Sequence, residues 1–417
     1  ESTADPVVKD NRIEACPDGS GILVREFGLG TMQGNTITDN AVAGVTVSTG
    51  AHPNITGNAM FKNQQYGVQA TEASRGQLEE NEITDNGVAN VVVTQNANPT
   101  LVGNTISSAK QGVYVHDGGK GVFTDNKITK YDLESVAITI STGGDPVFTN
   151  NRVEGCAGVA VFVTDAGLGR LEKNMVTGSG GAQVHVTAPG SRPTLLDNYI
   201  SSGRKQGILV TDGASGMFEH NRVSGNAMAG VEVANDATAP ELRLNIIDKN
   251  SLQGILVRAG ASATLDSNDV HHNDDVGLEV RGAQSGQGKG AQVMRNHFHD
   301  NSKGGVTLHD AAAGLLQSNE VFANPGGGVI AGSGVTMSIS QNHIYNKDGC
   351  GLVLEDGSAC SVSRNEVFTH SAEALVQEQG SQSKIGAGVD LNMLHTDQSD
   401  FVNVKHTQLA INSTAIT

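Results

Sequence analysis

One asparagine recurs along this chain at a nearly constant spacing. Thirteen of the fifteen intervals between successive copies are 22 to 24 residues, and the other two are 25 and 28. The residue two after each copy is apolar, and so is the residue three before it. Such a period predicts a stack of similar units rather than several globular domains. The sixteen copies are Asn11, Asn35, Asn58, Asn81, Asn104, Asn126, Asn151, Asn174, Asn198, Asn221, Asn245, Asn268, Asn296, Asn319, Asn342 and Asn365.

A second segment repeats in register with the asparagine. It reads glycine, apolar, any residue, apolar, as at 21–24, 112–115 and 254–257, and eleven of its fifteen copies begin with glycine. Alternating apolar residues indicate a strand with one buried face. No segment keeps a helical period, so the chain predicts an all-β fold. We expect a right-handed, single-stranded parallel β-helix, a solenoid of about sixteen coils, with the hand that chirality generally favours.

The composition agrees with a long and narrow core. Tryptophan is absent and aromatic residues are 4% of the chain, so stacked Val, Ile and Leu must fill the interior. We expect each repeated asparagine to lie where the chain changes direction, because asparagine tolerates left-handed backbone and can bond a turn. Stacked asparagine side chains can also bond one another between coils.

The repeat also sets the expected domain limits. Val8 and Asn11 already obey it, so residues 1–370 should form one β-helix that starts mid-coil and continues N-terminally in the natural protein. The interval of 28 residues contains a Gly-, Gln- and Ser-rich insertion, Gln284 to Gly290, which predicts a loop leaving the rod. Residues 371–417 should form an irregular last coil and a C-terminal cap. The last coil would fit Val389, Asn392 and Leu394.

Charge and targeting features limit the partners. The net charge of −17 disfavours binding to nucleic acid or to anionic membranes. No apolar run reaches 18 residues, so membrane insertion is not expected. Few cysteines and no visible signal peptide weakly favour an intracellular location. Cys350 and Cys360 could pair, and the sequence leaves this open. No motif points to a cofactor.

Two phrases resemble a known family. They are Gly112 to Gly121, which reads GVYVHDGGKG, and Asn226 to Val233, which reads NAMAGVEV. Together with a Gly/Pro alternation five residues before the asparagine, they look like the β-helix repeats of the F-box-only ubiquitin-ligase adaptors. The resemblance implies a pectate-lyase-like right-handed β-helix that serves as a substrate-recognition or scaffold rod. Neither an F-box nor paired zinc-binding cysteines are visible here, so a ligase role is not implied.

Catalytic acids of a β-helix would lie on an outward strand face, such as the outward position of the glycine-led strand. Its only acids are Glu232 and Glu279, two coils apart with Leu256 between them. The strand spacing separates them by about 10 Å, which is long for an inverting pair of carboxylates. A solvated sheet face is the favoured interpretation, and no catalytic residue is assigned.

The same outward position predicts an apolar ridge on alternate coils. A ridge of this kind can mark a partner site, although a loop or a missing region could also cover it. Its members, the predicted partner-binding residues, are Tyr114, Phe162, Leu209 and Leu256.

Histidines concentrate between residues 271 and 310. His and Asp on neighbouring coils could bind a divalent metal or supply a general base, although turn positions on a solenoid are usually only solvated. The candidate metal residues are His271, His272, His299 and Asp300.

These features favour a non-enzymatic recognition or scaffolding rod that presents a long surface to a protein partner. The alternative is a carbohydrate-active or carbohydrate-binding β-helix with its site near residues 271–310. A purely structural segment of a large assembly, with end-to-end contacts between copies, is a third possibility.

Overall fold

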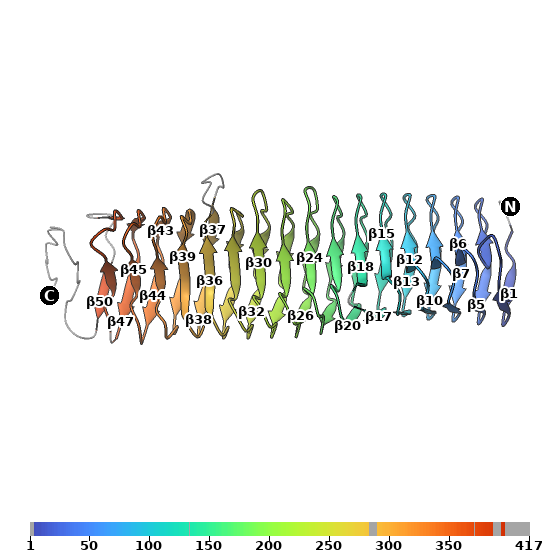
Figure 1. Cartoon of the computed structure of the whole chain (residues 1–417), viewed down its shortest axis with the longest axis horizontal. Helices are drawn as coiled ribbons and strands as arrows, with labels where there is room; N and C mark the ends of the chain where they lie inside the picture. Colours follow the sequence, from blue (N-terminus) through green and yellow to red (C-terminus); the bar gives the residue numbers. More distant parts are fainter. Residues whose placement is uncertain (1–3, 133, 283–289, 371, 387–392, 397–417) are drawn as a thin grey trace.

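The fold is a right-handed parallel β-helix of about sixteen coils, as the repeat predicted (Figure 1). The computed structural model describes residues 4–132, 134–282, 290–370, 372–386 and 393–396. These residues contain no helix. Every coil supplies one short strand to each of three sheets, and each strand pairs in parallel with its counterparts one coil away.

Sheet A contains the strand that precedes each repeated asparagine. Its strands are β1 (Val7–Lys9), β4 (Thr31–Gln33), β7 (Asn54–Thr56), β10 (Gln77–Glu79), β13 (Thr100–Val102), β16 (Val122–Thr124), β19 (Val147–Thr149), β22 (Arg170–Glu172), β25 (Thr194–Leu196), β28 (Met217–Glu219), β31 (Glu241–Arg243), β34 (Thr264–Asp266), β37 (Ala291–Met294), β40 (Gly314–Gln317), β43 (Ser338–Ser340), β46 (Ser361–Ser363) and β49 (Lys384–Ile385).

Sheet B contains the strand that follows each repeated asparagine. Its strands are β2 (Arg12–Glu14), β5 (Thr36–Thr38), β8 (Ala59–Phe61), β11 (Glu82–Thr84), β14 (Thr105–Ser107), β17 (Lys127–Tyr131), β20 (Arg152–Cys156), β23 (Met175–Thr177), β26 (Tyr199–Ser201), β29 (Arg222–Ser224), β32 (Ile246–Asp248), β35 (Asp269–His271), β38 (His297–His299), β41 (Glu320–Phe322), β44 (His343–Asn346), β47 (Glu366–Thr369) and β50 (Met393–Thr396).

Sheet C contains the glycine-led strand. Its strands are β3 (Ile22–Val24), β6 (Ala43–Val47), β9 (Tyr66–Ala70), β12 (Ala89–Val93), β15 (Gln111–Val115), β18 (Val136–Ile140), β21 (Val161–Val163), β24 (Val184–Val186), β27 (Ile208–Val210), β30 (Val231–Ala234), β33 (Ile255–Arg258), β36 (Val276–Arg281), β39 (Gly304–His309), β42 (Val329–Ala331), β45 (Leu352–Leu354) and β48 (Leu375–Gln377).

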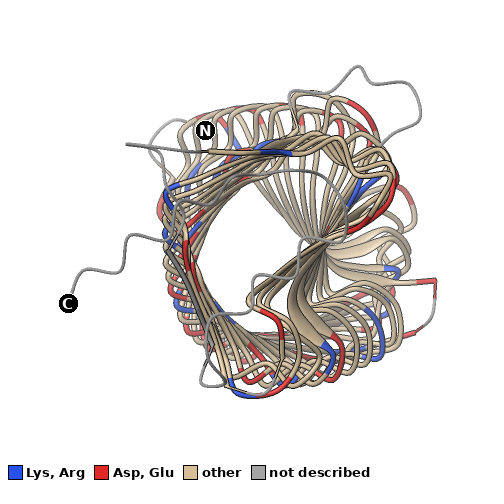
Figure 2. Cartoon of the chain, turned by 90° about the vertical axis from the view of Figure 1, so that its left-hand side faces the viewer, with Lys and Arg blue, Asp and Glu red and all other residues tan. Residues whose placement is uncertain are grey.

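The core runs the length of the rod inside the three sheets. Alternate residues of each strand point inward, so Val, Ile and Leu stack in columns with almost no exposure. Phe123 and Phe148 stack inside with ring centroids 4.3 Å apart. Viewed along the axis, Lys, Arg, Asp and Glu lie around the outside of the coils (Figure 2). The narrow core explains how a chain without tryptophan folds.

The repeated asparagine is buried and forms a ladder, but its backbone is not left-handed. In coil after coil the left-handed residue is the one before it, such as Glu80 (φ 53°) before Asn81. The Asn81 side chain donates to Asn104 Oδ1 at 2.9 Å and to the carbonyl of Ile55 at 2.8 Å. The predicted hydrogen bonds between asparagines of neighbouring coils are therefore confirmed. The prediction of a left-handed backbone at the asparagine was wrong, because its side chain can form these bonds only if it points inward after the turn.

A second asparagine ladder lines the corner between sheets B and C. Asn226 donates to Asn250 Oδ1 at 3.0 Å, and Asn250 donates to Asn273 Oδ1 at 2.9 Å. The ladder is interrupted between Asn86 and Asn226, where Tyr131 and other residues take its place. Its members are Asn40, Asn63, Asn86, Asn226, Asn250, Asn273, Asn301, Asn324 and Asn346.

The predicted termini and insertion are described only in part. Strands β49 and β50 pair with β46 and β47 and so supply two strands of a further coil, with Leu394 opposite Val367. Val389, Asn392, residues 397–417 and the insertion at 283–289 lie outside the described residues. All four cysteines are free thiols, so Cys350 and Cys360 are not paired.

Candidate functional site

The four predicted partner-binding residues all lie on the outer face of sheet C, and each is half-buried. They do not touch one another along a continuous ridge, because polar residues alternate with them in the pairing register. Phe162, Leu209 and Leu256 therefore have polar neighbours on both flanking coils, and Tyr114 lies between Val92 and Thr139. The column reads Tyr114, Thr139, Phe162, His185, Leu209, Glu232, Leu256 and Glu279.

Glu232 is buried within this outer face instead of being solvated, with 4% of its surface exposed. Its Oε1 accepts hydrogen bonds from Arg258 Nε at 2.7 Å and Arg258 Nη2 at 2.6 Å. Its Oε2 accepts a hydrogen bond from Gln206 Nε2 at 2.6 Å. These partners come from the preceding and following coils, so one carboxylate ties three coils together.

Glu279 has a related set of partners two coils later and is 6% exposed, but its arginine, Arg281, lies on its own strand, and His309 comes from the following coil. Its Oε2 accepts from Gln253 Nε2 at 2.5 Å, and its Oε1 accepts from Arg281 Nε at 2.7 Å. His309 adds a further bond, with its Nε2 2.6 Å from Glu279 Oε1, and its Nδ1 lies 3.2 Å from Asp310. Gln206 and Gln253 occupy the same repeat position, one before the strand glycine.

The electrostatics of Glu279 favour a permanent carboxylate. Burial raises the pKa of this carboxyl, but the hydrogen bonds from Arg281, His309 and Gln253 outweigh burial and hold the pKa below its ordinary value. The bond to Glu279 also raises the pKa of Arg281. A carboxylate in this state is unsuited to donate a proton to a leaving group.

The two sets together form what we call the sheet C site: Glu232 and Glu279 with their glutamine and arginine partners and His309. The arginine side chains keep 44% of their surface exposed, so the buried acids hold exposed guanidinium groups in fixed positions. Sequence reasoning found both acids but missed Gln206, Gln253, Arg258 and Arg281. The available signal was repetition at matched positions, one coil apart for the two arginines and two coils apart for the two glutamines.

The predicted histidine site lies elsewhere, on the outer face of sheet B. His299 Nε2 is 2.8 Å from Asp269 Oδ1, and its Nδ1 is 2.7 Å from Asp300 Oδ2. Both ring nitrogens therefore face carboxylates, and the bond to Asp269 raises the pKa of His299, which favours the doubly protonated ring. His271 stacks on His299 at 4.9 Å, and burial lowers the pKa of His271.

This arrangement does not gather ligands for a metal. His271 Nδ1 faces His272 Nδ1 at 2.8 Å, so the two rings share a hydrogen bond. A metal needs an unprotonated ring nitrogen, and both nitrogens of His299 are engaged by acids. Over the described ranges, no group of three or more His, Cys, Asp or Glu residues is placed to hold a metal ion.

Two columns on sheet B were missed by sequence reasoning. In one, acids and histidines alternate in register, with His297 3.7 Å from Glu320 and His343 3.8 Å from Glu366. In the other, aromatic rings stack on successive coils, with His299 and Phe322 4.7 Å apart. The first column is Asp269, His297, Glu320, His343 and Glu366, and the second is His271, His299, Phe322, Tyr345 and Phe368.

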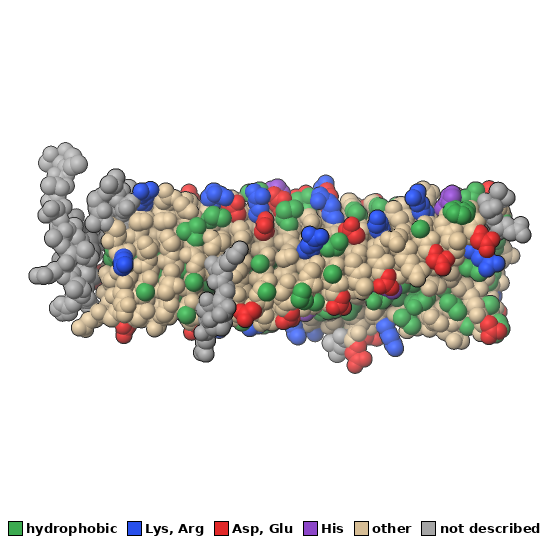
Figure 3. All heavy atoms as spheres, turned by 90° about the horizontal axis from the view of Figure 1, so that it is seen from above, with side chains coloured by type: hydrophobic (Ala, Val, Ile, Leu, Met, Phe, Trp, Pro, Cys, Tyr) green, Lys and Arg blue, Asp and Glu red, His purple; other side chains and the backbone are tan. Residues whose placement is uncertain are grey.

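Acidic and basic side chains are interspersed on the rest of the visible surface. In the view of Figure 3, Lys and Arg alternate with Asp and Glu along the rod without forming a single-sign stripe. In the part of the chain that is described, no helix is long and apolar enough to cross a membrane.

Solved structures similar to this chain are β-helix proteins. The Azotobacter vinelandii mannuronan C-5 epimerase AlgE4 A-module is 12% identical, with 88% of this chain and 91% of that chain covered and a TM-score of 0.42. A variant of the periplasmic alginate epimerase AlgG is 13% identical, covering 74% and 73%, with a TM-score of 0.40. The Agl-KA catalytic domain is 11% identical, covering 86% and 62%, with a TM-score of 0.32.

These likenesses carry no information on ligand or reaction. No curated protein matches the sequence. The family model described as the right-handed beta helix region matches residues 1–145, 136–287 and 245–389, which together span most of the chain. The resemblance to F-box-only adaptors is not supported beyond this shared repeat. The chain therefore belongs to the right-handed β-helix family.

Proposed function

We propose that this chain is a carbohydrate-binding β-helix that holds an extended polysaccharide along the outer face of sheet C. The observation that carries the proposal is the repeated set at Glu232 and Glu279, in which a buried carboxylate fixes an exposed arginine. Pre-positioned polar groups favour binding because less side-chain freedom is lost when the ligand arrives.

The chemistry of the face suits a ligand rich in hydroxyl groups. Arg281 and His309 are register partners, and Arg258 occupies the matching position one coil before Arg281. Half-buried Leu209 and Leu256 provide apolar contacts on the same face of sheet C. Because equivalent groups recur at the coil spacing of about 4.8 Å, they fit a linear polymer better than a compact molecule.

Binding without cleavage fits the acids better than hydrolysis. Glu232 and Glu279 lie two coils apart, about 10 Å by the strand spacing, with Leu256 between them. Paired glycosidase carboxylates lie about 5 to 9.5 Å apart, and one of them must be protonated. The lowered pKa of Glu279 opposes that role.

The experiment is affinity electrophoresis through gels that each contain one polysaccharide from a panel of charged and neutral polymers. The test variant is the double replacement Arg258→Gln and Arg281→Gln. The matched control is Arg170→Gln, since Arg170 is 43% exposed and pairs with Glu172 on sheet A. We expect at least one polysaccharide to retard both the wild type and the Arg170→Gln control. The double variant should bind this polysaccharide at least tenfold more weakly.

Two outcomes would contradict this proposal. One is that no polysaccharide retards the folded wild type. The other is that the double variant and the Arg170 control bind equally well, which would place the contact away from the sheet C site.

Protein recognition is a second candidate, and the half-buried side chains of Tyr114, Phe162 and Leu209 favour it. The wild type, used as bait in an extract of its own cells, should retain defined protein partners. A variant that combines Tyr114→Glu, Phe162→Glu and Leu209→Glu should lose them. The control triple is Val122→Glu, Val147→Glu and Met217→Glu on sheet A. Equal retention by both triples would count against this candidate.

A further inference from the structure

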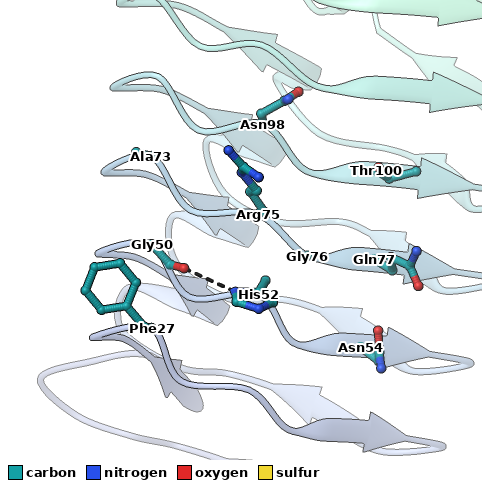
Figure 4. A pocket seen from close by; sticks show the side chains of 10 residues that line it. All are labelled: Phe27, Gly50, His52, Asn54, Ala73, Arg75, Gly76, Gln77, Asn98 and Thr100. Atoms are coloured by element: carbon teal, nitrogen blue, oxygen red, sulfur yellow. Dashed lines mark hydrogen bonds between the residues drawn. The ribbon is translucent and has the colours of Figure 1, made fainter. Parts of the chain in front are cut away.

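A hollow of about 750 Å³ opens near the N-terminal end, between the loops that leave sheet C and the strands of sheet A. Figure 4 shows two columns of side chains on successive coils: His52, Arg75 and Asn98 lie one above another, and Asn54, Gln77 and Thr100 lie along β7, β10 and β13. The Phe27 ring lies to the side of this column, next to Gly50. The volume is in the range of small-ligand sites.

Missing side chains create part of this space. A Cβ at Gly50 would lie 2.6 Å from Phe27 Cε1, so only glycine leaves room for the ring. Phe27 itself has a left-handed backbone, φ 59°, which bulky residues rarely adopt, and it is 62% exposed. Gly76 likewise presents no side chain between the two columns. The aromatic ring is thus held open to solvent at the edge of the hollow.

Several polar groups of the hollow have no partner within the described chain, whereas Asn98 Oδ1 accepts a hydrogen bond from the Gly121 N–H at 3.1 Å. The Arg75 guanidinium makes no ion pair or hydrogen bond with described residues, and the side-chain amides of Asn54 and Gln77 also have no partner there. The nearby Glu72 carboxylate accepts a hydrogen bond from the Thr49 hydroxyl at 2.6 Å instead. His52 Nδ1 lies 3.3 Å from the Gly50 carbonyl, which leaves its Nε2 for a ligand.

We propose that this hollow, the Arg75 hollow, binds a small ligand in which an oxyanion is joined to a flat ring. A guanidinium binds sulfate, phosphate or carboxylate oxygens through two parallel hydrogen bonds. The Phe27 ring offers an apolar face to the ring of the ligand, and the amides of Asn54 and Gln77 offer donors and acceptors for its substituents. This site is separate from sheet C, so it goes beyond polysaccharide binding.

The test uses 4-nitrophenyl sulfate as the charged probe and 4-nitrophenyl β-glucoside as the uncharged one. Binding to the full chain is measured by isothermal titration calorimetry and saturation-transfer NMR. The variants are Arg75→Gln and Phe27→Ala. Arg192→Gln is the matched control, because Arg192 is exposed at the same repeat position and lies outside the hollow.

We expect saturable binding of the sulfate ester, competition by inorganic sulfate, and at least tenfold weaker binding of the glucoside. Arg75→Gln should weaken binding of the ester at least tenfold, Phe27→Ala should weaken it as well, and Arg192→Gln should leave it unchanged. Circular dichroism establishes that each variant is folded. Equal binding by folded Arg75→Gln and wild type, equal binding of the two probes, or no saturable binding would overturn the proposal.

Discussion

The side chain of each repeated asparagine forms several hydrogen bonds to the neighbouring coils. Asn174 is buried, and its amide donates to Asn198 Oδ1 at 3.0 Å and to the Phe148 carbonyl at 3.0 Å. Its own Oδ1 accepts from the backbone N–H of Asn151 at 2.8 Å. Each ladder residue thus satisfies groups on the coils before and after it, which explains why the position recurs unchanged.

Replacing Asn174 with alanine should destabilise the rod by about 2 to 3 kcal/mol, because buried groups on neighbouring coils lose their partners. Urea unfolding followed by circular dichroism measures this change. Met175→Ala is the control, since Met175 is the next residue and is 37% exposed, and it should change stability by about 0.5 kcal/mol or less. Similar values for both variants would show that the ladder contributes little.

The ion pairs of His299 predict a pH dependence. The hydrogen bond to Asp269 raises the pKa of His299, the hydrogen bond to Asp300 adds to this effect, and burial opposes it. The protonated ring therefore contributes fully to the stability of the fold below the unfolded pKa of about 6.5, and this contribution is lost as the pH rises through the folded pKa. The same bond lowers the pKa of Asp269, whose contribution is lost as pH falls through that lowered pKa. His299→Gln should therefore lower stability by about 1 kcal/mol near pH 5.5 and by less near pH 8.5.

Thermal melts of the wild type and His299→Gln at the two pH values measure the effect. His220→Gln is the control, because His220 is an exposed histidine whose nearest acid, Asp197, is 3.9 Å away. A difference between wild type and His299→Gln that is constant with pH would contradict the argument.

At the scale of the strand, the glycine that precedes each sheet C strand is needed because the next coil packs too closely for a side chain. A Cβ on Gly254 would lie 2.3 Å from Val270 Cγ1 and 2.7 Å from the Gly277 carbonyl. At Gly225, by contrast, nothing lies within 4 Å, although its φ is 65°. The first glycine is needed for close packing and the second for its backbone conformation.

Gly254→Ala should therefore cost about 2 to 3 kcal/mol through overpacking, whereas Gly225→Ala should cost about 1 kcal/mol through its left-handed backbone. Denaturant midpoints of the two variants against wild type give the comparison. An equal or reversed order would show that neighbouring coils yield to the added methyl group.

The strands were predictable from the sequence because their signal is local and repeated. Apolar residues at fixed offsets from one asparagine, together with the glycine-led pattern, predicted short strands in every repeat, although the number of sheets was not predicted. The second ladder also left a signal, since Asn226 and Asn250 each follow a repeated asparagine by five residues, but Tyr131 and its neighbours interrupt that period. The partners of Glu232 were not predictable, because they depend on which side chains meet across coils.

At the scale of the whole molecule, the rod is a sum of nearest-neighbour contacts. Each strand pairs only with strands one coil away, so no residue of one end contributes to packing at the other. Stability in such a solenoid is approximately additive along its axis. The length of the rod is therefore set by the number of coils and not by a central core.

Deleting residues 152–174, one coil of 23 residues, should leave a folded rod because Asn151 would then be followed by a residue equivalent to Arg152. The shortened rod should keep the β-sheet circular dichroism spectrum and unfold with a slightly smaller denaturant slope. Deleting only 152–163 breaks the register and should abolish cooperative unfolding. If both deletions behaved alike, the coil would not be the unit of folding.

The asparagine ladders also give the rod a direction. The bonds from one ladder asparagine to the next run one way: Asn58, Asn81 and Asn104 each donate a side-chain N–H to the asparagine Oδ1 of the following coil. The rod is thus polar along its axis, with chemically different ends. Copies that extended these ladders end to end would all point the same way. Such growth would give a polar filament with distinct front and back, and not a closed two-fold dimer.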